Sequence, residues 1–208
     1  MARKMSGQNK LAWLRIAGIA GILTPVTAFT FIGLAVASYP QFSWVNNALS
    51  DLGVVPGVTS MLFNFGLYLS GLFFFIFAVG LFKTLDEHII GKIGSVVFVL
   101  ASLSLEGIGV FTENMRPWHL IFSVAFFVLV PIALLVVAGY YLLKRQKSMA
   151  VFTLLTAFVA AAPWVLQFLI NYVSGVAVPE AVSAIAGSIW AVVSGFKMFR
   201  AGSRAKTP

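Results

Sequence analysis

Cysteine is absent from this sequence, so disulfide bonds, thiolate catalysis and cysteine-bound zinc or iron–sulfur sites are excluded. Charged residues are scarce as well, at 10% of 208 residues, whereas 60% of the residues are hydrophobic. Because a soluble domain has about a quarter of its residues charged and about half apolar, this composition is typical of a membrane protein.

Histidine is also nearly absent. Only His88 and His119 occur, and an arrangement of six membrane spans predicts them on opposite sides of the membrane. That separation excludes a three-histidine zinc site and a haem held by two histidines. Carboxylates with a recognised calcium-binding spacing and a G-x-S-x-G nucleophile motif are both missing. The sequence therefore predicts no metal and no cofactor, and it leaves open whether the protein is an enzyme.

Six apolar runs are each long enough to cross a bilayer as a helix. They cover approximately residues 11–37, 60–82, 91–111, 118–143, 149–172 and 180–199. A signal peptide is the alternative for the first run, but that run exceeds the roughly 7 to 15 residues of an apolar signal segment. We predict an all-α polytopic membrane protein, a single six-transmembrane-helix bundle over residues 1–208.

The basic residues predict the orientation of this bundle. Of the 14 Lys and Arg residues, all but Arg116 fall on one side of a six-span arrangement. Cytoplasmic connections are enriched in Lys and Arg, so we predict a cell-membrane protein with both termini in the cytoplasm. The basic residues stand in short blocks between spans, which argues against a nucleic-acid partner despite the net charge of +8. Membrane lipids are the expected partners, with a second copy or another membrane protein as alternatives.

The first outer connection, residues 38–59, has its own pattern. Its apolar residues Val45, Ala48 and Leu52 recur at helical spacing. We predict a short interfacial helix that Ser43 caps at its start and that Gly53 ends in the left-handed conformation.

Acidic residues concentrate in the predicted outer half of the bundle. Glu106 lies within the third span, about 7 to 8 Å below its outer end at 1.5 Å per residue. A carboxylate at the centre of a span costs about 3 kcal/mol, so Glu106 is expected to have a partner or a function. Glu180 follows Pro179 at a helix start, where the helix dipole favours a carboxylate, and we assign it a structural role.

The candidate ligand-binding residues share a position at this outer end. They are Glu106, Asp51, His119, Glu113, Asn64, Ser50, Asn46, Gln167 and Asn171. We expect Asp51, Glu106 and His119 to contact one another. Structural alternatives remain open: an ion pair with Arg116 for Glu113, a loop hydrogen bond for His119, and interhelical hydrogen bonds for the amides.

Several of these residues also carry a resemblance. The residues that carry it form three segments: Asn46 with the run Ser-Asp-Leu-Gly at residues 50–53, Phe-Asn-x-Gly at residues 63–66, and Gly107 to Glu113 followed by His119. Together these segments resemble the DUF998 family of archaeal and bacterial membrane proteins. The resemblance implies a six-helix membrane fold and no known activity. A more distant similarity to the Frag1/DRAM/Sfk1 group would hint at lipid-linked biology.

Three functions fit these observations. The first is binding, with or without modification, of a lipid or amphiphile in a polar, acidic cavity on the extracytoplasmic side. The second is a small solute or ion transporter, for which Pro25 and Pro131 at similar depths suggest an inverted repeat. The third is a structural or accessory subunit in which the polar residues only tie helices together.

Overall fold

The structure is a computed structural model that describes residues 7–85 and 87–204. Its α-helices are α1 (Gly7–Ala37), α2 (Val58–Thr84), α3 (Ile89–Val110), α4 (Trp118–Leu143), α5 (Lys147–Ile170) and α6 (Ala177–Arg204), with a 3₁₀ helix η1 (Leu49–Val54) between α1 and α2. Within the described residues, six helices are long and apolar enough to cross a membrane. The predicted all-α, six-helix polytopic bundle is confirmed, and the chain is a multi-pass membrane protein.

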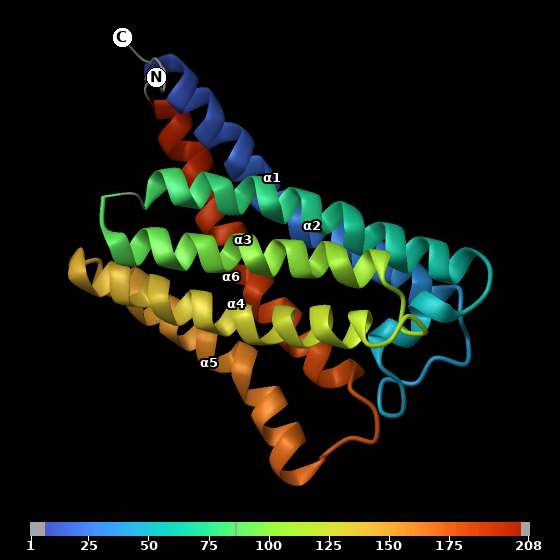
Figure 1. Cartoon of the computed structure of the whole chain (residues 1–208). Helices are drawn as coiled ribbons and strands as arrows, with labels where there is room; N and C mark the ends of the chain where they lie inside the picture. Colours follow the sequence, from blue (N-terminus) through green and yellow to red (C-terminus); the bar gives the residue numbers. More distant parts are fainter. Residues whose placement is uncertain (1–6, 86, 205–208) are drawn as a thin grey trace.

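The six helices form a closed ring. Each helix packs against the next one along the chain, and α6 packs against α1. In Figure 1, α2, α3 and α4 run side by side while α1 and α6 cross them at an angle. The space at the centre of the ring is therefore bordered by every helix.

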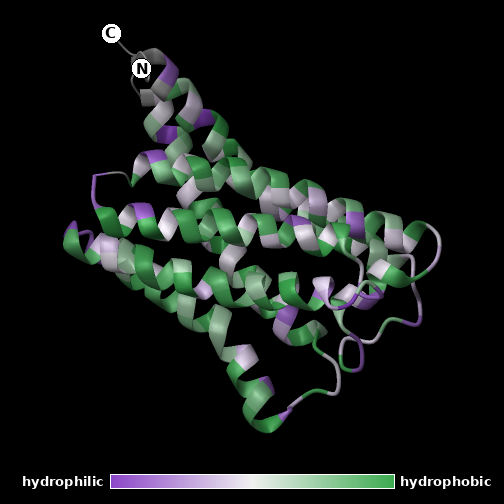
Figure 2. Ribbon diagram, viewed as in Figure 1, coloured by the Kyte–Doolittle hydropathy of each residue, from purple (hydrophilic) through white to green (hydrophobic). Residues whose placement is uncertain are grey.

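The two ends of the ring differ in charge. Both described termini and the α2–α3 and α4–α5 connections lie at one end, here the basic end, with Lys83, Lys92 and Lys144. The other three connections lie at the opposite end, here the acidic end, which contains Asp51 and Glu113. Figure 2 shows mostly hydrophobic helices, with hydrophilic residues gathered near these ends. Arg3, Lys4 and Lys206, which the orientation prediction counts, lie outside the described residues.

A layer of buried aromatic side chains crosses the middle of the six-helix ring. Phe98 of α3 stacks on Trp190 of α6 with the ring centroids 4.9 Å apart, and Phe74 and Phe77 of α2 pack against these rings edge-on. The indole Nε1 of Trp190 donates a hydrogen bond to Thr153 Oγ1 at 3.0 Å, so the buried indole N–H is satisfied. This layer joins α2, α3, α5 and α6 and separates the acidic half of the bundle from the basic half.

The short helix in the first connection differs from the prediction. It is a 3₁₀ helix that begins at Leu49, and Leu49 and Leu52 are buried against the ring instead of lying in the membrane interface. Gly53 was predicted to end the helix in the left-handed conformation, but it lies within the helix, and the glycine with a positive φ (97°) is Gly57. Gly53 is needed for a close approach, because a β-carbon there would lie 2.6 Å from Asn64 Oδ1.

Helix α5 separates from the ring at its second half. Pro163 lies inside α5, where it removes a backbone hydrogen bond and favours a bend. The second half points away from α4 in Figure 1, and Phe168, Leu169 and Ile170 are strongly exposed. The ring is therefore less tightly closed between α5 and α6 at the acidic end than elsewhere.

Candidate functional site

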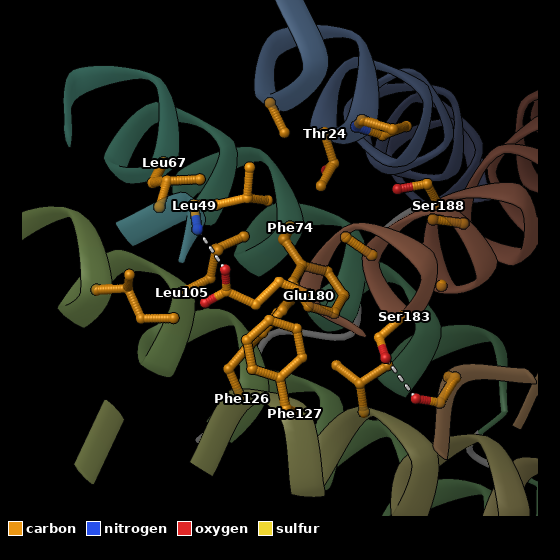
Figure 3. Close-up of a pocket in the computed structure, with 18 of the residues that line it drawn as sticks. Thr24, Leu49, Leu67, Phe74, Leu105, Phe126, Phe127, Glu180, Ser183 and Ser188 are labelled. Atoms are coloured by element: carbon orange, nitrogen blue, oxygen red, sulfur yellow. Dashed lines mark hydrogen bonds between the residues drawn. The ribbon is translucent and has the colours of Figure 1, made fainter. Parts of the chain in front are cut away.

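A cavity occupies the acidic half of the ring. It includes about 1070 Å³ of space between atoms, part of which is open to the outside, and residues of all six helices and η1 line it. The aromatic layer forms its floor, with Phe74, Phe98 and Trp190 in the wall. Most of the remaining lining is aliphatic or aromatic, as Figure 3 shows. Such a cavity suits a hydrocarbon chain, because burial of apolar surface stabilises a ligand there.

Glu180 is the only acidic residue that lines the cavity among the described residues, and no Lys or Arg lines it. It lies in the first turn of α6 and is 8% exposed. Its Oε2 accepts a hydrogen bond from the backbone N–H of Leu49 at 2.6 Å (Figure 3). Its Oε1 has no hydrogen-bond partner within the described part of the chain. A buried carboxylate needs hydrogen bonds or a counter-charge, so this oxygen is available to a donor on a ligand.

Hydroxyl groups surround the same space. Ser50, Ser123, Ser183 and Ser188 line the cavity together with Thr24. The hydroxyls of Ser183 and Thr24 already donate to the backbone carbonyls of Ala160 and Ala20, so they present only their remaining lone pairs. The polar groups of the lining are thus mainly hydrogen-bond acceptors.

The connections at the acidic end hold η1 over the cavity. The N–H of Gly175 donates to the carbonyl of Val45 at 2.7 Å, and the N–H of Ala177 donates to that of Asn47 at 2.9 Å. The bond from Leu49 to Glu180 continues this series into the cavity wall. These bonds join the α1–α2 connection to the start of α6 and close the acidic end with protein backbone.

Two more carboxylates lie at η1: Asp51 belongs to this helix, and Glu113 lies beside Asp51. Asp51 Oδ2 accepts hydrogen bonds from the N–H of Ala48 (3.0 Å) and from Asn47 Nδ2 (2.7 Å). Burial and the neighbouring Asp51 carboxylate raise the pKa of Glu113, while Arg116, 3.7 Å away, and Ser50 act in the opposite direction. Asp51, Glu113 and Glu180 thus bring three acidic side chains together at this end.

The sequence comparison identifies the family. The profile of the family described as "protein of unknown function (DUF998)" matches residues 8–197. The chain belongs to the DUF998 family. It matches none of the curated proteins and none of the solved structures with which it was compared.

Glu106 of this DUF998 protein lies within the third span as predicted, but it contacts α2 and does not line the cavity. It is half buried and packs against Gly71 of α2, where an added β-carbon would lie 2.8 Å from the Glu106 backbone nitrogen. No hydrogen bond to its carboxylate is formed among the described residues, and it does not line the cavity. Within the described residues no hydrogen bond joins Glu106 to Asp51 or to His119, and Glu106 is in close contact with α2.

His119 has the loop hydrogen bond that was its structural alternative. Its Nδ1 lies 2.6 Å from the carbonyl oxygen of Phe111, and its Nε2 lies 3.3 Å from Ser123 Oγ. The imidazole of His119 is buried and does not line the cavity, whereas Ser123 does. His119 is thus connected to the cavity only through the Ser123 hydroxyl.

The predicted amide residues mostly tie segments together. Asn64 Nδ2 donates to the carbonyl of Gly53 at 2.9 Å and fixes the end of η1 to α2. Gln167 Nε2 donates to Asn171 Oδ1 at 2.8 Å at the end of α5, and Asn46 bonds Ser43 in an exposed turn. None of the four amide or turn residues lines the cavity.

The sequence analysis predicted a cavity at this end but assigned Glu180 to a structural role and did not count it among the ligand-binding candidates. The signal was present in its helix, because Glu180, Ser183 and Gly187 follow one another on one face of α6 and all line the cavity. Nothing local to Glu180 reveals its partner, since Leu49 is 131 residues away.

Proposed function

We propose that this DUF998 protein binds a single-chain amphiphile in the acidic half of its bundle, with the apolar chain in the cavity and the head group at Glu180. The observation that carries this proposal is a buried carboxylate in a cavity lined mostly by aliphatic and aromatic side chains. One of its oxygens is bonded to η1, and the other has no hydrogen-bond partner among the described residues. A mostly apolar space that contains a carboxylate has a polarity complementary to that of an amphiphile.

The charges favour a particular head group. The cavity lining contains a carboxylate and no basic side chain, and Asp51 and Glu113 add negative charge nearby. A phosphate or carboxylate head group would be repelled, whereas an ammonium group would be attracted and would donate to Glu180. We therefore propose an amine head group as the preferred ligand chemistry.

We also propose that the basic end faces the cytoplasm of a cell membrane. Lys83, Lys92, Lys144 and Lys147 lie at that end, which matches the excess of Lys and Arg in cytoplasmic connections. In this orientation the cavity lies in the extracytoplasmic half of the bilayer. The aromatic layer beneath it favours binding over transport, because the buried rings of Phe77, Phe98 and Trp190 stand between the cavity and the basic end.

The test compares three ligands of equal chain length. A long-chain amine, the corresponding alcohol and the corresponding fatty acid are titrated against the purified protein, and bound ligand is counted by native mass spectrometry. We expect the amine to bind best and the fatty acid worst. Loss of a hydrogen bond to a charged group costs about 1.5 to 3 kcal/mol, so Glu180→Gln should weaken amine binding about 10- to 100-fold.

Glu106→Gln is the matched control, since Glu106 is also an acid within a span but lies outside the cavity lining. It should leave amine binding unchanged. Glutamine at position 180 retains an oxygen that accepts from Leu49, so the first variant keeps its bond to η1. Equal binding of all three ligands, or none, would contradict the proposal and would favour a structural role for these polar residues.

A further inference from the structure

Helices α1 and α6 are in tight contact at the basic end. A β-carbon on Gly18 would lie 2.5 Å from the Gly195 carbonyl oxygen, and one on Gly202 would lie 2.7 Å from that of Leu11. Small residues allow helix backbones to approach closely inside a membrane. Along this stretch of α1 and α6 the interface leaves no room for another molecule.

Nearer the acidic end, the same pair of helices borders a groove on the outside of the ring. Its lining comes from α1 and α6: Pro25, Phe29, Ile185, Ser188, Ile189, Val192 and Val193. Pro25, Phe29 and Ser188 also line the cavity, so the groove and the cavity share a wall. Figure 3 shows Ser188 beside the cavity on α6, across from Thr24 of α1.

The groove faces hydrocarbon. It lies within the spans of α1 and α6, no charged residue lines it, and Ile185 and Ile189 are 48% and 53% exposed. Lipid chains therefore cover these side chains in a membrane. A hydrocarbon chain is the occupant that this surface matches, because Ser188 is the only polar side chain that lines it among the described residues.

The ends of the cavity are less suited to entry. The acidic end is closed by η1 and by the backbone hydrogen bonds between residues 45–47 and 175–177. The opposite end is closed by the aromatic layer. An amphiphile that came from the aqueous side would have to break these bonds, whereas one dissolved in the bilayer meets the groove directly.

We propose that the ligand enters sideways from the bilayer between α1 and α6, with its chain passing over Ser188 between Pro25 and Phe29. This inference rests on the proposed function, and it adds the membrane itself as the source of the ligand. Passage through the wall that the groove and the cavity share leaves the bound state unchanged, so substitutions confined to the groove alter the rate of binding and not its extent.

The experiment uses the protein in nanodiscs and a long-chain amine with bromine atoms in its chain, which quench tryptophan fluorescence on contact. Trp190 lies in the cavity wall and is 1% exposed, whereas Trp44 and Trp118 are 47% and 54% exposed and face the surroundings. The part of the quenching that Trp190→Phe removes therefore reports arrival in the cavity. Stopped-flow mixing gives its rate.

Val192→Phe with Val193→Phe fills the groove without touching the cavity lining. We expect it to slow Trp190 quenching by at least about tenfold with the same final quenching. Val124→Phe with Val128→Phe is the matched control, since both residues are exposed on α4 and line neither space. The control should quench at the wild-type rate.

Widening the groove with Val192→Ala and Val193→Ala should accelerate quenching, which keeps the test meaningful if the phenylalanine variant folds poorly. Wild-type rates in both groove variants would overturn this route and would point to entry elsewhere, for instance where α5 leaves the ring. No Trp190 quenching in the wild type at any time would instead refute the binding proposal on which this inference depends.

Discussion

Replacing Gly18 by alanine is expected to force α1 and α6 apart. The added β-carbon would lie 2.5 Å from the Gly195 carbonyl oxygen and 2.6 Å from the Phe199 backbone nitrogen. Both are backbone atoms, so no side chain can rotate away to make room. One helix would have to retreat by about 0.5 Å to reach even a 3.0 Å separation, in an interior that is packed like a crystal.

Gly33 provides the matched control, because a β-carbon there meets nothing within 4 Å and the residue lies on the same helix. Both substitutions gain the same intrinsic helix propensity of alanine, so their difference isolates the crowding. Overpacking costs about 1 to 3 kcal/mol. At roughly 2 to 4 °C per kcal/mol for a chain of this length, Gly18→Ala should melt about 2 to 12 °C below Gly33→Ala.

The assay is thermal unfolding of both variants in one detergent, followed by circular dichroism at helical wavelengths. Gly195→Ala serves as the reciprocal test, since its β-carbon would lie 2.6 Å from the Gly18 carbonyl oxygen. If Gly18→Ala and Gly33→Ala melt within about 1 °C of each other, the tight α1–α6 contact is wrong. The contrast between that contact and the open groove would then have no basis.

Three further predictions concern the acidic end and the aromatic layer. Burial and Asp51 raise the pKa of Glu113, so the folded state holds that proton more tightly; wild-type melting temperature should fall as pH rises from the ordinary glutamate pKa through the raised pKa, and Glu113→Gln should flatten this dependence. Asn64→Ala should speed amide hydrogen exchange in η1 and cost about 1 kcal/mol, since its side chain donates to the η1 backbone. Thr153→Val should lower thermal stability by about 1 to 3 kcal/mol, because it leaves the buried Trp190 N–H unpaired; unchanged melting would contradict the hydrogen bond.

The helices were accessible from sequence because each apolar run has a chemical boundary. The fourth run was placed at 118–143, and α4 occupies Trp118–Leu143, between Pro117 and Lys144. Lipid leaves no alternative to a helix for such a run, since every backbone group must be bonded within the segment. The first connection offered no such constraint. Its conformation depends on hydrogen bonds to residues 175–177, which local periodicity cannot reveal.

Glu106 and Glu180 show why the site was harder to predict than the fold. The helical spacing of polar residues around Glu106 does indicate a face turned toward other helices. In a ring, however, each helix faces two neighbouring helices as well as the centre. Because Gly71 has no side chain, the face of α3 that carries Glu106 packs closely against α2. Glu180 faces the centre because α6 begins beneath η1, and the Glu180 carboxylate accepts a hydrogen bond from the N–H of Leu49, the first residue of η1. Periodicity separates lipid-facing residues from protein-facing ones, but only the packing of α6 against η1 determines which buried acid meets the cavity.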